Sequence, residues 1–127
     1  MRRKLVTIAV VVLMLTALGL VEQIGVRRIT DRALAETGAL KTAVENGEMD
    51  TAKEKAHALD RAWDRQTKWL EMLVDHGSTD DVRYALSRMI ASLEAGDRAA
   101  ALIYAGELEG SIEHVIERQS VTPENLF

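Results

Sequence analysis

The chain has 127 residues, enough for one domain, and its lack of Cys excludes disulfide bonds and thiolate chemistry. The formal net charge is −4, and without Arg2, Arg3 and Lys4 the remaining 13 basic residues face 20 acidic ones. Binding to phosphates needs a basic face, so this balance argues against nucleic acid as a partner. One Pro, few aromatic residues and many Ala, Leu and Glu predict an all-α protein.

The N-terminal segment has the pattern of a membrane anchor. Basic residues 2–4 precede Leu5 to Val21, a run of 17 residues without a charge. As a helix this run would span about 26 Å, slightly less than the roughly 30 Å of a hydrocarbon core. The basic cluster favours a cytoplasmic N-terminus, which predicts a single-pass protein of the cell membrane with an extracytoplasmic domain. Arg27, Arg28 and Arg32, beyond the run, weaken this orientation.

A cleaved signal peptide is the alternative interpretation. Ala17-Leu18-Gly19 has the small-x-small form of a signal-peptidase site, with Leu5 to Thr16 as its apolar region. The apolar run continues past Gly19 and no polar stretch precedes this site, which favours an uncleaved signal-anchor. Under both interpretations the rest of the chain is extracytoplasmic.

Regular turn signals divide the remaining sequence into four predicted helices, at 23–46, 50–76, 79–95 and 97–119. The first of these can continue the anchor helix. The expected C-terminal stops are Gly47, Gly77 and Gly96, and the expected N-caps are Asp50, Ser78 or Thr79, and Asp97. The predicted domains are therefore an anchor at 1–22, a helical bundle at 23–119 and a C-terminal tail at 120–127.

Each predicted helix carries an apolar stripe with steps of three and four residues, which predicts an antiparallel bundle of about four helices with short loops. The expected stripes are Ile29, Ala33, Leu40 and Val44 in 23–46; Ala52, Ala56, Leu59, Trp63, Gln66, Leu70 and Leu73 in 50–76; Val82, Leu86, Met89 and Leu93 in 79–95; and Ala101, Ala105, Leu108, Ile112 and Val115 in 97–119.

One stretch of the sequence returns after 49 residues. "VENGEMDTAKEKAHAL", from Val44, matches the outline of "LEAGDRAAALIYAGEL", from Leu93, in its apolar, Glu, Gly, acidic and Ala positions. Each copy covers the end of one helix, a Gly turn and the start of the next. We therefore expect two helical hairpins of the same design, whether they arose by duplication or by convergence of helix–Gly–helix turns.

Residues suited to catalysis or metal binding are sparse. Glu54 and His57 form one Glu-x-x-His motif, whereas a di-iron bundle needs two such motifs and two further Glu, and His57 lies off the apolar stripe. His76, at the predicted end of helix 50–76, is interpreted as a C-terminal cap, with a cation or pH-sensing site beside Asp75, Asp80 and Asp81 as the alternative. We expect no catalytic, cofactor or metal residues.

Four residues are candidates for contact with a partner. Trp69 lies about one position off the core stripe and is expected at the flank of the core, with docking as the alternative if it is exposed. His76 is the second. Leu126 and Phe127 end the chain, and we expect them to fold back onto the bundle or to dock elsewhere.

Several of these pieces occur in the order found in one family. They are "GEMDTAKEKAHAL", the run from Trp63 to Leu73, His76, "HVIERQ" from His114, and the C-terminal "ENLF". Together they resemble an uncharacterised bacterial family described only as domain of unknown function 4363. The "GST" after His76 departs from the acidic residue expected there. The resemblance implies a short anchor followed by a small all-helical outer domain, and it implies no activity and no catalytic residues.

We therefore expect a non-enzymatic, membrane-tethered helical bundle that acts as an accessory or protein-binding module. Its expected partners are membrane lipid through residues 5–21 and an integral membrane or envelope protein. The alternative is a sensor domain that binds a small ligand or a metal between its helices.

Overall fold

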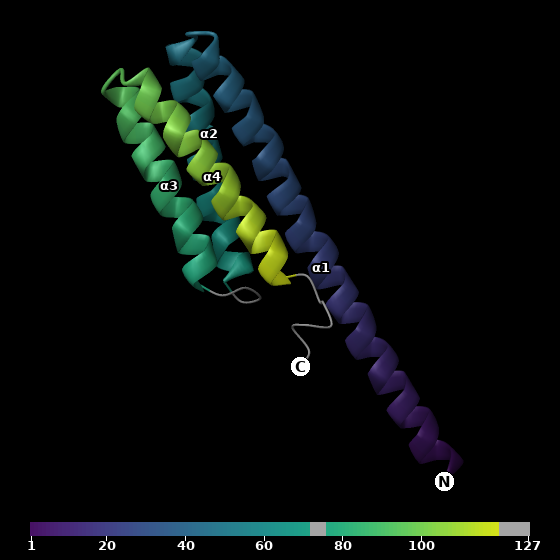
Figure 1. Cartoon of the computed structure of the whole chain (residues 1–127). Helices are drawn as coiled ribbons and strands as arrows, with labels where there is room; N and C mark the ends of the chain where they lie inside the picture. Colours follow the sequence, from purple (N-terminus) through teal and green to yellow (C-terminus); the bar gives the residue numbers. More distant parts are fainter. Residues whose placement is uncertain (72–75, 120–127) are drawn as a thin grey trace.

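A computed structural model describes residues 1–71 and 76–119. In these residues the protein is all-α, as predicted, and consists of α1 (Arg2–Glu45), α2 (Met49–Leu70), α3 (His76–Glu94) and α4 (Arg98–Gln119). The four helices run up and down in a bundle, and each packs on two neighbours, with α4 closing against α1. Figure 1 shows that the α1–α2 and α3–α4 turns lie at the same end of the bundle, and that α1 extends far beyond the other end.

The segment predicted as an anchor and the first bundle helix form one continuous helix. Helix α1 passes without a break through Gly19, Gly25 and Gly38, so the expectation that the first bundle helix can continue the anchor is confirmed. Residues 1–22 are exposed, whereas buried residues begin at Val26. The same helix is therefore apolar all round in its first half and amphipathic in its second half.

The part of α1 inside the bundle buries threonines that the sequence analysis did not assign to the core. Six of its seven buried positions, all but Ala43, follow each other in steps of three and four: Val26, Thr30, Ala33, Thr37, Leu40 and Val44. Such spacing forms the seam of a left-handed helix bundle. Ile29, which we expected in this seam, is only partly buried. The predicted stripe was incomplete because it lacked Val26 and the two threonines.

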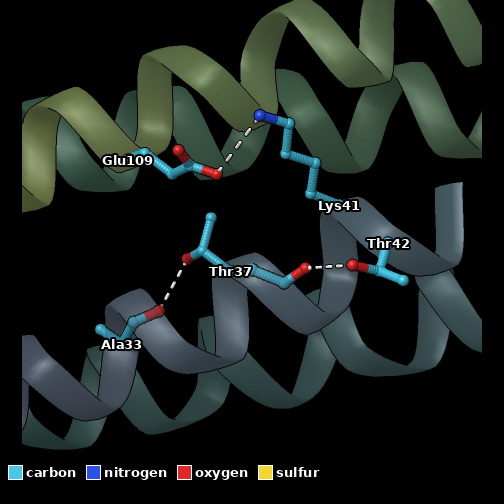
Figure 2. A network of polar contacts seen from close by, with 6 residues as sticks. Ala33, Thr37, Lys41, Thr42 and Glu109 are labelled. Atoms are coloured by element: carbon cyan, nitrogen blue, oxygen red, sulfur yellow. Dashed lines mark hydrogen bonds and ion pairs between the residues drawn. The ribbon is translucent and has the colours of Figure 1, made fainter. Parts of the chain in front are cut away.

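The buried hydroxyl groups of Thr30 and Thr37 form hydrogen bonds within α1. Thr30 Oγ1 donates to the carbonyl of Val26 at 3.0 Å, and Thr37 Oγ1 donates to that of Ala33 at 2.7 Å (Figure 2). A buried hydroxyl without a partner would cost about 1–3 kcal/mol. Back-bonding to the preceding turn removes this cost and leaves the methyl group of Thr to pack in the seam.

The stripes of the other helices agree largely with the prediction. The expected residues of α3 and α4 are all buried, as are Ala52, Ala56, Leu59 and Trp63 of α2. Further along α2, Thr67 is buried and Gln66 is only partly so; Thr67 Oγ1 donates to the carbonyl of Trp63. The seam therefore takes a step of four after Trp63, where we expected a step of three. The side chains of Leu70 and Leu73 lie outside the described residues.

The two stretches that match at an offset of 49 residues form the same kind of turn, one between α1 and α2 and one between α3 and α4. Gly47 and Gly96 adopt positive φ angles of 77° and 71°. The N–H of Glu48 donates to the carbonyl of Ala43, and the N–H of Asp97, 49 residues later, donates to that of Ser92, both at 2.9 Å. The N–H groups of the two glycines also donate to carbonyls three residues back, each at 3.1 Å. Both turns are thus Schellman motifs, in which a left-handed Gly ends the helix.

The acidic residue after each Gly opens the next helix. Asp97 Oδ1 accepts a hydrogen bond from the N–H of Ala100 at 3.0 Å, which is the predicted N-cap. In the other turn the N-cap position belongs to Glu48, whose side chain makes no capping bond. The prediction of Asp50 as N-cap was wrong, because the Schellman turn places the start of α2 directly after Gly47.

The connection from α2 to α3 differs from the prediction. Helix α2 ends at Leu70 and α3 begins at His76, so His76 starts a helix and its expected role as a C-terminal cap of helix 50–76 is wrong. Gly77, predicted as a stop, lies in the first turn of α3, and the positive-φ glycines of the described chain do not include it. Ser78 and Thr79, predicted as N-caps, are buried in this turn. A Gly next to Ser and Thr signals a boundary equally well at either end of a helix.

One side chain ties the two hairpins together at the turn end. Arg98, the first residue of α4, donates from Nε to the carbonyl of Val44 at 2.9 Å and from Nη2 to that of Glu45. These carbonyls belong to the last turn of α1, where the regular helical N–H donors run out; the carbonyl of Val44 also accepts from the N–H of Gly47. The positive charge also lies at the negative end of the helix dipole. Arg98 thus caps a helix of the other hairpin.

Substitution of the glycines should change stability in opposite directions. Gly96→Ala should lower the free energy of unfolding by about 1–2 kcal/mol, because Ala is strained in the left-handed conformation. Gly106→Ala, in the interior of α4 with nothing within 4 Å of the added Cβ, should raise it by up to about 1 kcal/mol. Denaturant unfolding of the full chain in detergent, followed by circular dichroism, measures both. Equal signs would contradict the Schellman assignment.

Arg98→Ala should lower the free energy of unfolding by about 1–3 kcal/mol, since two carbonyls of α1 lose a charged donor. Arg61→Ala, which removes an exposed arginine on α2, is the matched control and should change it by less than about 0.5 kcal/mol. The same denaturation experiment measures both variants. A loss no larger in Arg98→Ala than in Arg61→Ala would show that the cap does not stabilise the fold.

Candidate functional site

A cluster of aromatic, apolar and charged residues crosses the outer side of α3 and α4, and all of them are exposed except Tyr104, which is partly buried; we call it the α3–α4 face. Its members are Tyr84, Arg88, Ile103, Tyr104 and Glu107. Arg88 ion-pairs with Glu107 across the two helices, with Nη2 2.5 Å from Oε1. The Arg88 guanidinium also lies 5.9 Å from the centroid of the Tyr104 ring, within the range of a cation–π interaction.

The α3–α4 face is unusual because large side chains on it remain in solvent. Tyr84 is 58% exposed and Ile103 is 69% exposed. Tyr and Arg are the residue types that contribute most to binding energy in protein interfaces. Tyr84 and Arg88 are four residues apart and therefore share one side of α3. This arrangement is suited to contact with another protein.

The sequence analysis did not identify the α3–α4 face. The available signal was position: Tyr84 and Arg88 lie off the stripe that contains Leu86, and Ile103 lies off the stripe from Ala101 to Val115. An Ile outside the predicted core stripe was a sign of exposed apolar surface. That α3 and α4 bring these residues together required the register of the second hairpin.

Trp69 is more exposed than we expected for a residue at the flank of the core. It is 43% exposed, and its ring rests on α1 at Gly25. A Cβ added to Gly25 would lie 2.7 Å from Cη2 of Trp69, so the indole occupies the space that the absent side chain leaves. Trp69 is the second-to-last residue of α2, and Figure 1 shows that α2 ends where α1 extends beyond the bundle.

The other predicted contact residues are described only in part. The backbone of His76 begins α3, but its side chain lies outside the described residues, as do Asp75, Leu126 and Phe127. The tail at 120–127 is likewise outside them. Of the four candidate contacts, the structure therefore describes the side chain of Trp69 and only the backbone of His76.

The described imidazoles are spread over the surface. His57 Nε2 lies 3.1 Å from Glu94 Oε1, which links α2 to the end of α3, and both side chains are about half exposed. His114 lies 3.7 Å from Glu117 on α4. Within residues 1–71 and 76–119, no group of three or more His, Asp or Glu side chains is arranged to hold a metal ion. Of the Glu54–His57 motif, it is His57 that makes this link from α2 to α3.

A small cavity lies between α1 and α2. Its volume is about 90 Å³, and its walls are Ile29, Arg32, Ala33, Glu36, Leu59, Ala62, Arg65 and Gln66. Ligand sites for small molecules usually measure about 300–1,000 Å³. Arg32 and Glu36 at its mouth pair with each other at 3.4 Å and are largely exposed. This cavity has room for a few water molecules.

Polar contacts between neighbouring helices are otherwise peripheral. Lys41 of α1 reaches Glu109 of α4, with Nζ 3.8 Å from Oε1 (Figure 2), and Arg83 of α3 reaches Asp64 of α2 at 3.7 Å. These pairs are partly or largely exposed, so each contributes at most about 1 kcal/mol to the free energy of unfolding. They link adjacent helices at the surface of the bundle.

The architecture agrees with a comparison to protein families. The family model described as Domain of unknown function (DUF4363) matches residues 23–126 of this chain. The chain belongs to the DUF4363 family. The matched region begins within α1, just after the exposed apolar segment, and the DUF4363 domain thus corresponds to the helical bundle and the residues that follow it. No match was found among curated proteins or among solved structures.

Proposed function

We propose that this DUF4363 protein is a non-enzymatic binding module that α1 anchors in the cell membrane, with its bundle on the extracytoplasmic side. The observation that carries this proposal is the continuity of α1. Its first half contains an apolar run with no buried residue that is a candidate membrane span by length and composition, and its second half supplies one seam of the bundle core. An unbroken helix would hold the bundle directly above the lipid.

An uncleaved anchor agrees with the large exposed apolar surface of the helix. Leu5, Leu13 and Val21 are each more than 60% exposed, on a segment with no bundle helix beside it. Soluble proteins rarely expose an apolar patch of this extent, whereas lipid tails would cover it. Basic residues 2–4 support a cytoplasmic N-terminus, which gives the bundle its proposed extracytoplasmic location.

The α3–α4 face is the proposed contact with an integral membrane or envelope protein. It combines two tyrosines, a held arginine and an exposed isoleucine on two adjacent helices. The ion pair and the cation–π contact restrain Arg88 and Tyr104, which reduces the entropy lost when a partner binds. The proposed role is accessory: the module binds its partner and performs no chemistry.

A ligand- or metal-sensing bundle is the alternative that the sequence suggested. The cavity of about 90 Å³ between α1 and α2 is smaller than a usual ligand site. Of the described imidazoles, His57 on α2 pairs with Glu94 and His114 on α4 pairs with Glu117. These observations favour a surface-binding role.

The proposed topology predicts where a new thiol is accessible. Since the chain has no Cys, Ser87→Cys on the exposed side of α3 creates a single reactive site. A membrane-impermeant maleimide should label it in intact cells, and the protein should stay in the membrane after an alkaline carbonate wash. The unsubstituted chain is the blank. Labelling that needs cell lysis would contradict the orientation, and release by carbonate would contradict the anchor.

The proposed partner contact predicts site-specific cross-linking. A photoreactive phenylalanine at Tyr84 should yield a discrete protein adduct in native membranes, because the α3–α4 face is in contact with the partner. The same group at Ala58, which is exposed on α2, is the matched control and should yield little. An adduct of equal yield at both positions, or at neither, would contradict a partner on the α3–α4 face.

A further inference from the structure

We propose that Trp69 is a second membrane contact, which inserts its indole into the phospholipid headgroup layer and holds the bundle in one orientation on the bilayer. This inference rests on the proposed anchoring by α1. It adds to the anchor a contact made by a different helix, at a residue distant in the sequence.

The first observation is a space reserved for the indole. Trp69 of α2 lies against Gly25 of α1, and a Cβ at Gly25 would come within 2.7 Å of its ring. Any residue with a side chain at this position would push the ring away from α1. Gly is otherwise unfavourable inside a helix. Here it allows a large aromatic side chain from α2 to lie directly on the anchor helix.

The second observation is the height of this contact along α1. The apolar run ends at Val21, and Gly25 follows four residues later, about 6 Å further along the helix axis. Each headgroup region of a bilayer is roughly 5–8 Å thick, from the difference between the total and hydrocarbon thickness. With Val21 at the hydrocarbon boundary, the ring of Trp69 lies at the depth of the headgroups.

The third observation is the exposure of the side chain. Trp69 is 43% exposed, whereas Trp63, two turns back on α2, is 2% exposed and belongs to the core. Tryptophan is enriched at membrane–water interfaces because its ring is largely apolar and its N–H can bond to headgroups or water. The exposed part of Trp69 therefore suits this layer better than bulk water.

The charges nearby agree with a phospholipid surface. Arg27 and Arg28 on α1, and Lys68 beside Trp69, are exposed and can reach phosphate groups. Glu22 is also exposed at this level, so the surroundings of Trp69 carry both signs. A zwitterionic headgroup layer presents both signs as well, which is why we assign this contact to lipid and not to an acidic protein surface.

The contact would limit the motion of the bundle. A single helix that crosses the bilayer leaves the domain free to tilt and rotate about the helix axis. A tryptophan on a second helix, in the same headgroup layer, removes part of that freedom. The bundle is then held with its α2–α3 end toward the lipid and its Gly turns away from it.

Fluorescence quenching by lipid tests the proposal. The full chain is placed in vesicles of phosphatidylcholine that carries bromine high on its acyl chains, near the headgroups. The wild-type emission should be quenched, Trp69→Phe should lose most of this quenching, and Trp63→Phe should keep it. The difference between the wild type and Trp69→Phe reports on Trp69 even if Trp63→Phe does not fold. Equal quenching in the wild type and in Trp69→Phe would overturn the proposal.

Two glycine variants test whether the position of the ring matters. Gly25→Ala should reduce the quenching of Trp69 and make it more accessible to aqueous iodide, because the added Cβ displaces the ring. Gly38→Ala is the matched control on the same helix, where nothing lies within 4 Å of the added Cβ, and it should leave both values unchanged. Equal effects of the two substitutions would overturn the role of Gly25.

The outcome separates the two proposals. A carbonate wash of the same vesicles shows whether the chain is anchored at all. Protein that is washed out overturns the anchoring on which this inference depends. Protein that is retained while iodide, and not brominated lipid, quenches Trp69 overturns the headgroup contact alone and leaves the anchor in place. Because the vesicles contain no other protein, quenching by brominated lipid comes from the bilayer.

Discussion

The structure depends on one helix, α1, that meets two different surroundings along a single axis. Up to residue 22 its side chains are exposed all round, and from Val26 onward one side of it is buried by α2 and α4. Because successive turns of a helix are hydrogen-bonded to one another, the direction in which the buried seam faces, around the axis of α1, is fixed relative to the apolar half. Helices α2 and α4 pack directly on the second half of α1, and α3 packs on α2 and α4. The position of the whole bundle is therefore fixed relative to the apolar first half of α1.

Packing near the Gly turns relies on small residues in two helices and large ones in the others. Ala52 and Ala56 of α2, and Ala101 and Ala105 of α4, are fully buried at the level of Leu40, Met89 and Leu93 from α1 and α3. Alternation of small and large side chains lets a layer fill without voids. It also brings the two hairpins close enough for the Arg98 side chain to reach the end of α1. The two Gly turns are thus linked to each other through the Arg98 cap on the end of α1.

The sequence predicted most where a single physical signal was sufficient. A left-handed Gly followed by an acid identified both hairpin turns, and the uninterrupted alanine and leucine steps identified the seams of α2 and α4. It failed at Thr30, Thr37 and Thr67, because a hydroxyl that bonds its own helix is chemically as acceptable in a core as on a surface. Gly77 was misassigned because a helix-compatible Gly and a helix-ending Gly differ only in φ. The α3–α4 face and the Trp69–Gly25 contact could not be predicted, since each depends on which residues of two helices end up at the same level.

The two Gly turns lie at the same end of the bundle, so α1 determines how far both of them stand from the end of the apolar run at Val21. From Val21 to Gly47, α1 rises by roughly 39 Å at 1.5 Å per residue. With Val21 at the lipid boundary, and with little tilt, the turn that contains Gly47 and its counterpart at Gly96 stand at nearly this elevation, next to each other. Insertion or deletion of a helical turn between Val21 and Val26 would raise or lower this tip by about 5 Å. In the proposed anchored topology, the length of α1 would therefore set the distance from the membrane at which the bundle meets a partner.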